Sequence, residues 1–98
     1  MQFIQQNNIK PVMARVALAI AAVSDHALPG ESQSLFAQAQ ESMSAAITHL
    51  SRTRSEYDYL ALELLVLHAE FLLKELSRKT EIPLPMLDPE NSSGIKRI

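Results

Sequence analysis

The run LALELLVLHAEFLLKEL, from Leu60 to Leu76, is the most apolar part of this 98-residue chain. With about 100° between successive residues of a helix, the nearby charged side chains fall on one narrow line, formed by Glu56, Glu63, Glu70 and Lys74. Almost every other position on the helical wheel is Leu, Val, Ala or Phe. A surface helix usually buries an apolar stripe of about 100°, and this helix offers roughly twice that width. The run therefore predicts a helix that packs on two sides, most simply the central helix of a helical dimer.

Two apolar seams run along this helix, which we expect to extend from about Glu56 to Lys79. Both seams alternate spacings of three and four residues, the pattern of helix-packing positions. The first comprises Tyr57, Leu60, Leu64, Leu67 and Phe71, and the second comprises Leu62, Leu65, Ala69, Leu72 and Leu76. One seam would face the chain's own core and the other a second subunit, but the spacing does not say which. Ion pairs at i,i+4 are expected for Glu70 with Lys74 and for Glu75 with Lys79.

The candidate interaction residues come from both seams and from the apolar segment that follows the helix. They are Leu60, Leu62, Leu64, Leu65, Leu67, His68, Phe71, Leu72, Leu76, Leu84, Met86 and Leu87. The histidine of this set lies inside the apolar arc, so we expect a core or interface residue with one hydrogen-bond partner rather than a ligand or proton relay. Burial in an interface favours neutral imidazole, so acid pH should loosen the assembly.

A first helix is expected before this central one. Its seam repeats the same spacing and consists of Ile9, Met13, Val16, Ile20 and Val23. Asn8 is the expected N-cap, and Pro11 would then lie in the first turn, where its missing N–H costs little. The helix should end near Ser24, and Pro29-Gly30 predicts a turn.

A second helix should follow this turn, with Ser32 or Ser34 as its N-cap. It is amphipathic, and its apolar arc consists of Leu35, Phe36, Ala39, Met43, Ala46, Ile47 and Leu50. The opposite side is polar, so this helix is expected to keep one face in water.

A break is expected between the second and third helices, at residues 51–55. Continuing the second helix would place Arg54 in its apolar arc. Two capping boxes are possible here, Thr53 with Glu56 and Ser55 with Asp58. One long helix through both segments remains the alternative, because no glycine or proline interrupts them.

The helical part is expected to end before three prolines, which are Pro83, Pro85 and Pro89. The sequence thus predicts a helical domain at 1–81 and an extended, proline-containing tail at 82–98. The apolar start of the tail should lie across a groove on its own bundle or on a partner. The predicted fold is all-α: a helical hairpin with an N-terminal helix packed on it, assembled as a dimeric helical bundle.

Composition narrows the classes of function. Apolar residues make up 47% of the chain, which excludes a disordered chain. The net charge of −2 lacks the basic footprint of a nucleic-acid binder. There is no cysteine for disulfides or thiol chemistry. No run approaches the roughly 20 apolar residues of a membrane span. The apolar segment 16–23 lacks a small-residue cleavage site, so we expect a packed helix there and a cytoplasmic protein.

The sequence contains no recognised catalytic, cofactor or metal-binding pattern, so we expect no enzyme, cofactor or metal. Glu63 and His68 are five residues apart and diverge by about 140°, unlike the Glu and His three apart of a di-iron bundle. With two glycines in the chain, no phosphate-binding loop can form. No nucleophile elbow is present.

An excess of apolar helix surface without a chemical site is typical of proteins that bind other proteins. We expect a small regulator or adaptor, antiactivator-like or chaperone-like, that sequesters a partner protein and forms a homodimer. Two alternatives remain: a helical carrier of an apolar small molecule, and a subunit of a larger complex whose site forms only with another chain.

Overall fold

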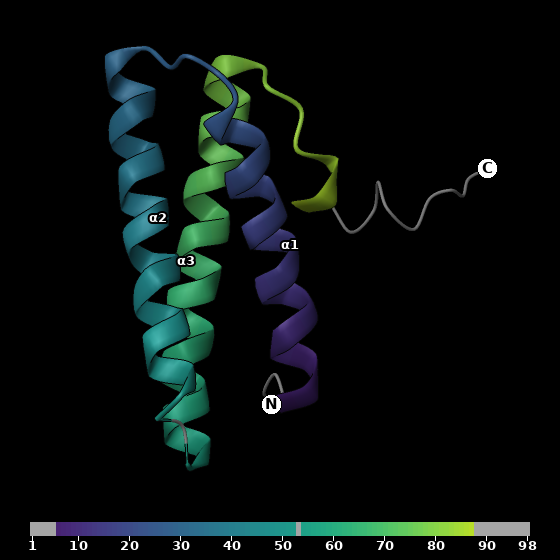
Figure 1. Cartoon of the computed structure of the whole chain (residues 1–98), viewed down its shortest axis with the longest axis vertical. Helices are drawn as coiled ribbons and strands as arrows, with labels where there is room; N and C mark the ends of the chain where they lie inside the picture. The colour runs from purple at the N-terminus through teal and green to yellow at the C-terminus, as the bar shows by residue number, and fades with distance from the viewer. Residues whose placement is uncertain (1–5, 53, 88–98) are drawn as a thin grey trace, which may run out of the picture.

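The computed structural model of the chain describes residues 6–52 and 54–87, and these residues form helices without a strand. Three α-helices, α1 (Gln6–Ser24), α2 (Gly30–Leu50) and α3 (Glu56–Thr80), are followed by the short 3₁₀ helix η1 (Pro85–Leu87). Helices α2 and α3 form an antiparallel hairpin, and α1 lies along the hairpin in the same direction as α3 (Figure 1). The predicted all-α, three-helix fold is therefore confirmed.

The hairpin is held together by a core to which α3 contributes most of the volume. Five residues of α3 are completely buried: Leu62, Val66, Ala69, Leu73 and Leu76. On α2 the buried apolar residues are Ala39, Met43 and Ala46. Small side chains on the facing surfaces allow two helices to approach closely, so α2 can lie near the Leu-rich side of α3. The predicted polar side of α2 is exposed.

Helix α1 packs on the hairpin through the seam that its spacing predicts, with Ala19 buried as well. The helix begins at Gln6, two residues before the expected start. The prediction of Asn8 as N-cap and Pro11 in the first turn is therefore wrong. Pro11 lies inside the helix and lacks the N–H that would donate to the carbonyl of Asn7, so α1 loses one backbone hydrogen bond near its start.

Helix α2 also begins earlier than expected, at Gly30 directly after Pro29. Neither of the two predicted serines caps it: Ser32 is buried within the helix and Ser34 accepts a hydrogen bond from a glutamine side chain one turn later. The first turn is closed instead by the backbone N–H of Gln33, which donates to the carbonyl of Pro29 at 2.9 Å, while its side-chain amide donates to the carbonyl of Leu28 at 3.0 Å. The helix thus begins without a side-chain cap.

The break between α2 and α3 is present, so one uninterrupted helix is excluded. Ser55 is the N-cap of α3, and its Oγ accepts a hydrogen bond from the backbone N–H of Asp58 at 3.3 Å. The Asp58 carboxylate accepts one from the backbone N–H of Arg54 at 3.0 Å. The first bond confirms Ser55 as the cap in the predicted pair of Ser55 with Asp58, and the Asp58 carboxylate reaches back to the residue before the cap. The alternative box involves Thr53, which lies outside the described residues.

Helix α3 ends in a left-handed residue, Glu81, with φ of 63°. Its backbone N–H donates to the carbonyl of Ser77 at 2.7 Å, which satisfies one of the free carbonyls at the helix end. The hydroxyl of Ser77 donates to the carbonyl of Ile82, and the backbone N–H of Ile82 donates to Thr80 Oγ1 at 3.3 Å. These bonds turn the chain back toward the bundle.

After this turn, residues 82–87 cover their own bundle. Leu84 and Leu87 are buried in the core, and η1 packs on α1. The segment is not extended throughout, because the N–H of Leu87 donates to the carbonyl of Leu84 at 3.1 Å and closes the 3₁₀ turn. The rest of the predicted tail, residues 88–98, lies outside the described residues.

One of the two predicted ion pairs on α3 is present: Lys74 Nζ lies 3.4 Å from Glu70 Oε2. Glu75 pairs with Arg78 instead of Lys79. Lys79 Nζ lies 3.7 Å from Glu31 on α2, because the start of α2 and the end of α3 meet in the antiparallel hairpin. Surface pairs of this kind each contribute less than about 1 kcal/mol.

Candidate interaction face

One side of α3 carries an apolar surface that its own chain leaves open, here called the outer face of α3. It consists of the first predicted seam and the adjoining histidine: Tyr57, Leu60, Leu64, Leu67, His68 and Phe71. The exposed fractions are 84% for Tyr57, 61% for Leu64, 40% for Leu67 and 63% for Phe71. Leu60 is half-buried. Because these residues recur every three or four positions, they form one continuous stripe along the helix.

The opposite side of α3 belongs to the core. Of the second predicted seam, Leu62, Ala69, Leu72 and Leu76 are buried and Leu65 is half-buried. The most deeply buried line is turned slightly from that seam, since it includes Val66 and Leu73, which sequence reasoning placed in neither seam. Together with Leu62, Ala69 and Leu76, these two residues form a line spaced four, three, four and three residues apart. This spacing is the sequence signal that could have identified the buried side of α3.

The structure therefore divides the candidate residues into three groups. Five have their side chains in the subunit's own core: Leu62, Leu72, Leu76, Leu84 and Leu87. Leu65 and Met86 are half-buried at its edge. The remaining candidates lie together on the outer face and are Leu60, Leu64, Leu67, His68 and Phe71.

His68 lies on the outer face, within one turn of Leu64 and Phe71, and is exposed. The expectation of a core histidine is wrong for the single subunit, because the bundle lies on the other side of α3. A role in an interface between chains stays a prediction.

Other exposed apolar side chains are isolated. Within the described part of the chain, two large ones lie outside α3: Leu18 on α1 is 59% exposed, and Ile47 on α2 is 56% exposed. Single exposed apolar residues are ordinary on protein surfaces. The outer face differs because its members are contiguous.

The two ends of the outer face carry similar charged groups. Toward the C-terminal end of α3, Arg78 hydrogen-bonds Glu75, and this contact lowers the pKa of Glu75 and raises that of Arg78. At the N-terminal end, the backbone N–H of Arg54 holds the pKa of Asp58 below its ordinary value. The side chain of Arg54 is exposed there. Each end thus presents an arginine, with a carboxylate already engaged beside it.

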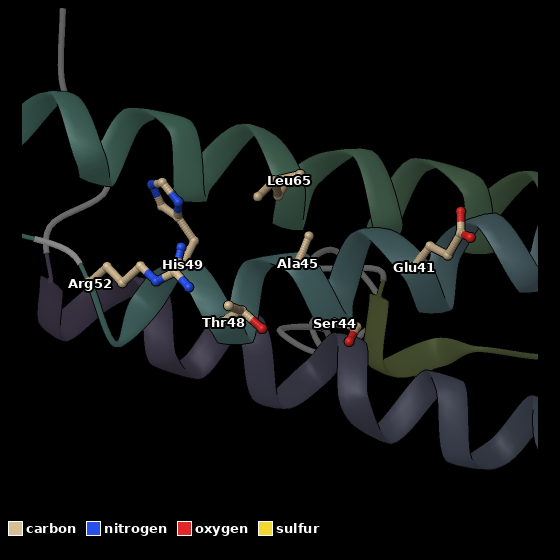
Figure 2. A pocket seen from close by; sticks show the side chains of 7 residues that line it. All are labelled: Glu41, Ser44, Ala45, Thr48, His49, Arg52 and Leu65. Atoms are coloured by element: carbon tan, nitrogen blue, oxygen red, sulfur yellow. The ribbon is translucent and has the colours of Figure 1, made fainter.

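A shallow, open pocket of about 400 Å³ lies on another side of the hairpin, between α2 and α3. Figure 2 shows Arg52 and Glu41 at its opposite ends and His49 pointing from α2 toward α3. The lining residues are Glu41, Ser44, Ala45, Thr48, His49, Arg52 and Leu65. Neither Tyr57 nor His68 is among them, so the pocket is separate from the outer face. Its polar rim and open shape differ from the enclosed apolar cavity that a carrier of apolar molecules needs.

The described residues contain no group of three or more metal-ligating side chains close enough to share an ion. None of the helices in residues 6–52 and 54–87 combines the length and apolarity needed to cross a bilayer. No known protein family, curated protein or solved structure matches this chain.

Proposed function

We propose that this protein is a non-enzymatic interaction module, a regulator or adaptor that binds and sequesters a partner protein through the outer face of α3. The observation that carries this proposal is the exposure of Leu64, Leu67 and Phe71 in one stripe on a helix whose opposite side is completely buried.

The energetic argument rests on the apolar area that remains in contact with water. Fully burying one large apolar side chain stabilises by about 1.5–3 kcal/mol. Leu64, Leu67 and Phe71 are each roughly half open, so covering all three would contribute on the order of 3 kcal/mol. A contribution of this size would change an affinity about 100-fold, because each 1.4 kcal/mol is a tenfold change.

The geometry suits recognition of a helix or an apolar groove. Leu60, Leu64, Leu67 and Phe71 are spaced four, three and four residues apart. This is the anchor pattern of an amphipathic helix that lays its apolar side on a partner. The rigid hairpin holds α3 as a helix before binding, so little conformational entropy is lost on association.

The proposal is tested by affinity capture with the full chain from lysate of its native host. Three baits are compared: wild type, Leu64→Glu and Leu18→Glu. The last two place the same charge at positions of nearly equal exposure, 61% and 59%, on different helices. We expect wild type and Leu18→Glu to retain the same stoichiometric protein and Leu64→Glu to lose it. Retention by all three baits would contradict a role for the outer face.

A further inference from the structure

We propose that a second copy of this chain covers the outer face of α3, with the two α3 helices antiparallel about a twofold axis between Leu64 and Leu67. This inference rests on the proposed function, because it names a partner for the same face.

The spacing of the outer face reads the same in both directions. Within it, positions 60, 64, 67 and 71 are separated by four, three and four residues, and Tyr57 and Lys74 lie three residues beyond the two ends of this run. In an antiparallel pair, Leu64 therefore meets Leu67 of the second copy, and Leu60 meets Phe71. Each contact occurs twice, as a twofold axis requires. The long apolar side chains fall opposite one another along the whole seam.

Charge favours the antiparallel over the parallel arrangement. Lys74 continues the seam and is 51% exposed. A parallel pair would place it against Lys74 of the second copy and Glu75 near Glu75. The antiparallel pair places Lys74 against Tyr57, whose ring can accept a cation.

The glutamates beside the seam do not oppose this arrangement strongly. The side chain of Glu70 is only 13% exposed and is paired with Lys74 at 3.4 Å. It is thus turned toward its own subunit with its charge compensated. Glu63 is half-buried beside it.

The exposed apolar area of the outer face is also large enough for an interface with a second copy. If a fully open large side chain offers on the order of 200 Å², the exposed fractions of Tyr57, Leu64, Leu67 and Phe71 leave roughly 500 Å² per subunit. Two such faces together supply about 1,000 Å², the lower limit for a specific interface, before Leu60, His68 and the charged rim are counted. Self-association at this limit is reversible, so a sequestered protein would compete with the second copy for the same face.

The direction of pairing is tested with single cysteines, since the chain has none of its own. Leu60→Cys and Phe71→Cys are oxidised mildly, each alone and as a mixture, with Leu18→Cys as the control. A disulfide needs Cα atoms within about 7 Å. We expect a disulfide-linked dimer of the two different variants in the mixture and little linkage in either variant alone. Efficient linkage of each variant to itself would overturn the antiparallel pairing.

Sedimentation equilibrium separates this inference from the proposed function. We expect dimers for wild type and Leu18→Glu, and a dimer dissociation constant raised about 100-fold or more for Leu64→Glu, because the charge enters the interface from both copies. Circular dichroism checks that Leu64→Glu stays helical, as expected for an exposed position. A wild-type monomer at all concentrations would overturn the second copy as occupant, whereas the capture experiment would still test binding of a different protein.

Discussion

The two sides of α3 have nearly the same composition and opposite environments. The inner side, with Leu62, Leu73 and Leu76, is completely covered by the other helices, whereas Leu64 and Phe71 on the outer side are more than half exposed. Apolar content alone therefore does not place a residue in the core. Whether a residue of α3 is buried depends on the side it lies on, because α1, α2 and η1 together cover only one side of this helix.

The largest expected effect comes from truncating each side in turn. Leu73→Ala should lower the free energy of unfolding by about 2–5 kcal/mol, because it leaves a cavity in a filled core. Leu64→Ala should change it by less than about 0.5 kcal/mol in dilute solution. Urea unfolding of both variants measures the difference. Equal losses would mean that the two sides are equally covered and would break the comparison.

Removing the cap at the start of α3 should have a smaller effect on the free energy of unfolding. The cap stabilises the helix as a whole and therefore supports both its buried and its exposed side. Ser55→Ala removes the acceptor for the N–H of Asp58 and should cost about 1 kcal/mol of unfolding free energy. The hydroxyl of Ser51, in the same connection, donates to the carbonyl of Thr48 at the end of α2, so Ser51→Ala is the matched control. If both variants unfold alike, the cap does not position α3.

The opposite end of α3 offers a stabilising change. Glu81 has a left-handed backbone, which costs a non-glycine residue about 1 kcal/mol or more. Glu81→Gly should raise the free energy of unfolding by up to about 1 kcal/mol, less the entropy that glycine loses on folding. Thermal unfolding measures the gain. A clear loss would show that the Glu81 side chain has a stabilising role that its exposed position does not explain.

The smallest expected effect depends on pH. The pKa of Asp58 is lowered below 3.8, chiefly by the backbone N–H of Arg54. Its carboxylate thus stabilises the fold above this value, and the contribution is lost as pH falls through the lowered pKa, because the unfolded chain binds the proton more readily. Asp58→Asn should therefore be less stable than wild type at neutral pH, and the two should converge in acid. A difference independent of pH would exclude the charge as its cause.

Much of the fold was predictable because local signals agree with it. The alternating spacing of Ile9 to Val23 predicted the buried side of α1, and Ser55 with Asp58 predicted where α3 begins. The starts of α1 and α2 were not predicted. Asn8 and Ser32 are good capping residues in isolation, but the helices continue past them toward the N-terminus.

The candidate face was predicted only as one of two possibilities. Both seams of α3 consist mostly of leucine and have the same spacing, so these features do not distinguish Leu64 from Leu65. The choice depends on where α1 and α2 pack, and that is set by contacts between residues far apart in the sequence. The folding back of Leu84 and Leu87 depends on the turn at Glu81 in the same way.

The most direct test of the central claim compares the labelling rates of two engineered cysteines, Leu64→Cys and Leu18→Cys, in the otherwise cysteine-free chain. The two positions are almost equally exposed in the single subunit. A thiol reagent is applied at rising concentrations of the unlabelled wild-type chain and, separately, in lysate of the native host. We expect the thiol of Leu64→Cys to become protected while that of Leu18→Cys reacts at a constant rate. Equal labelling of both under all conditions would contradict the central claim.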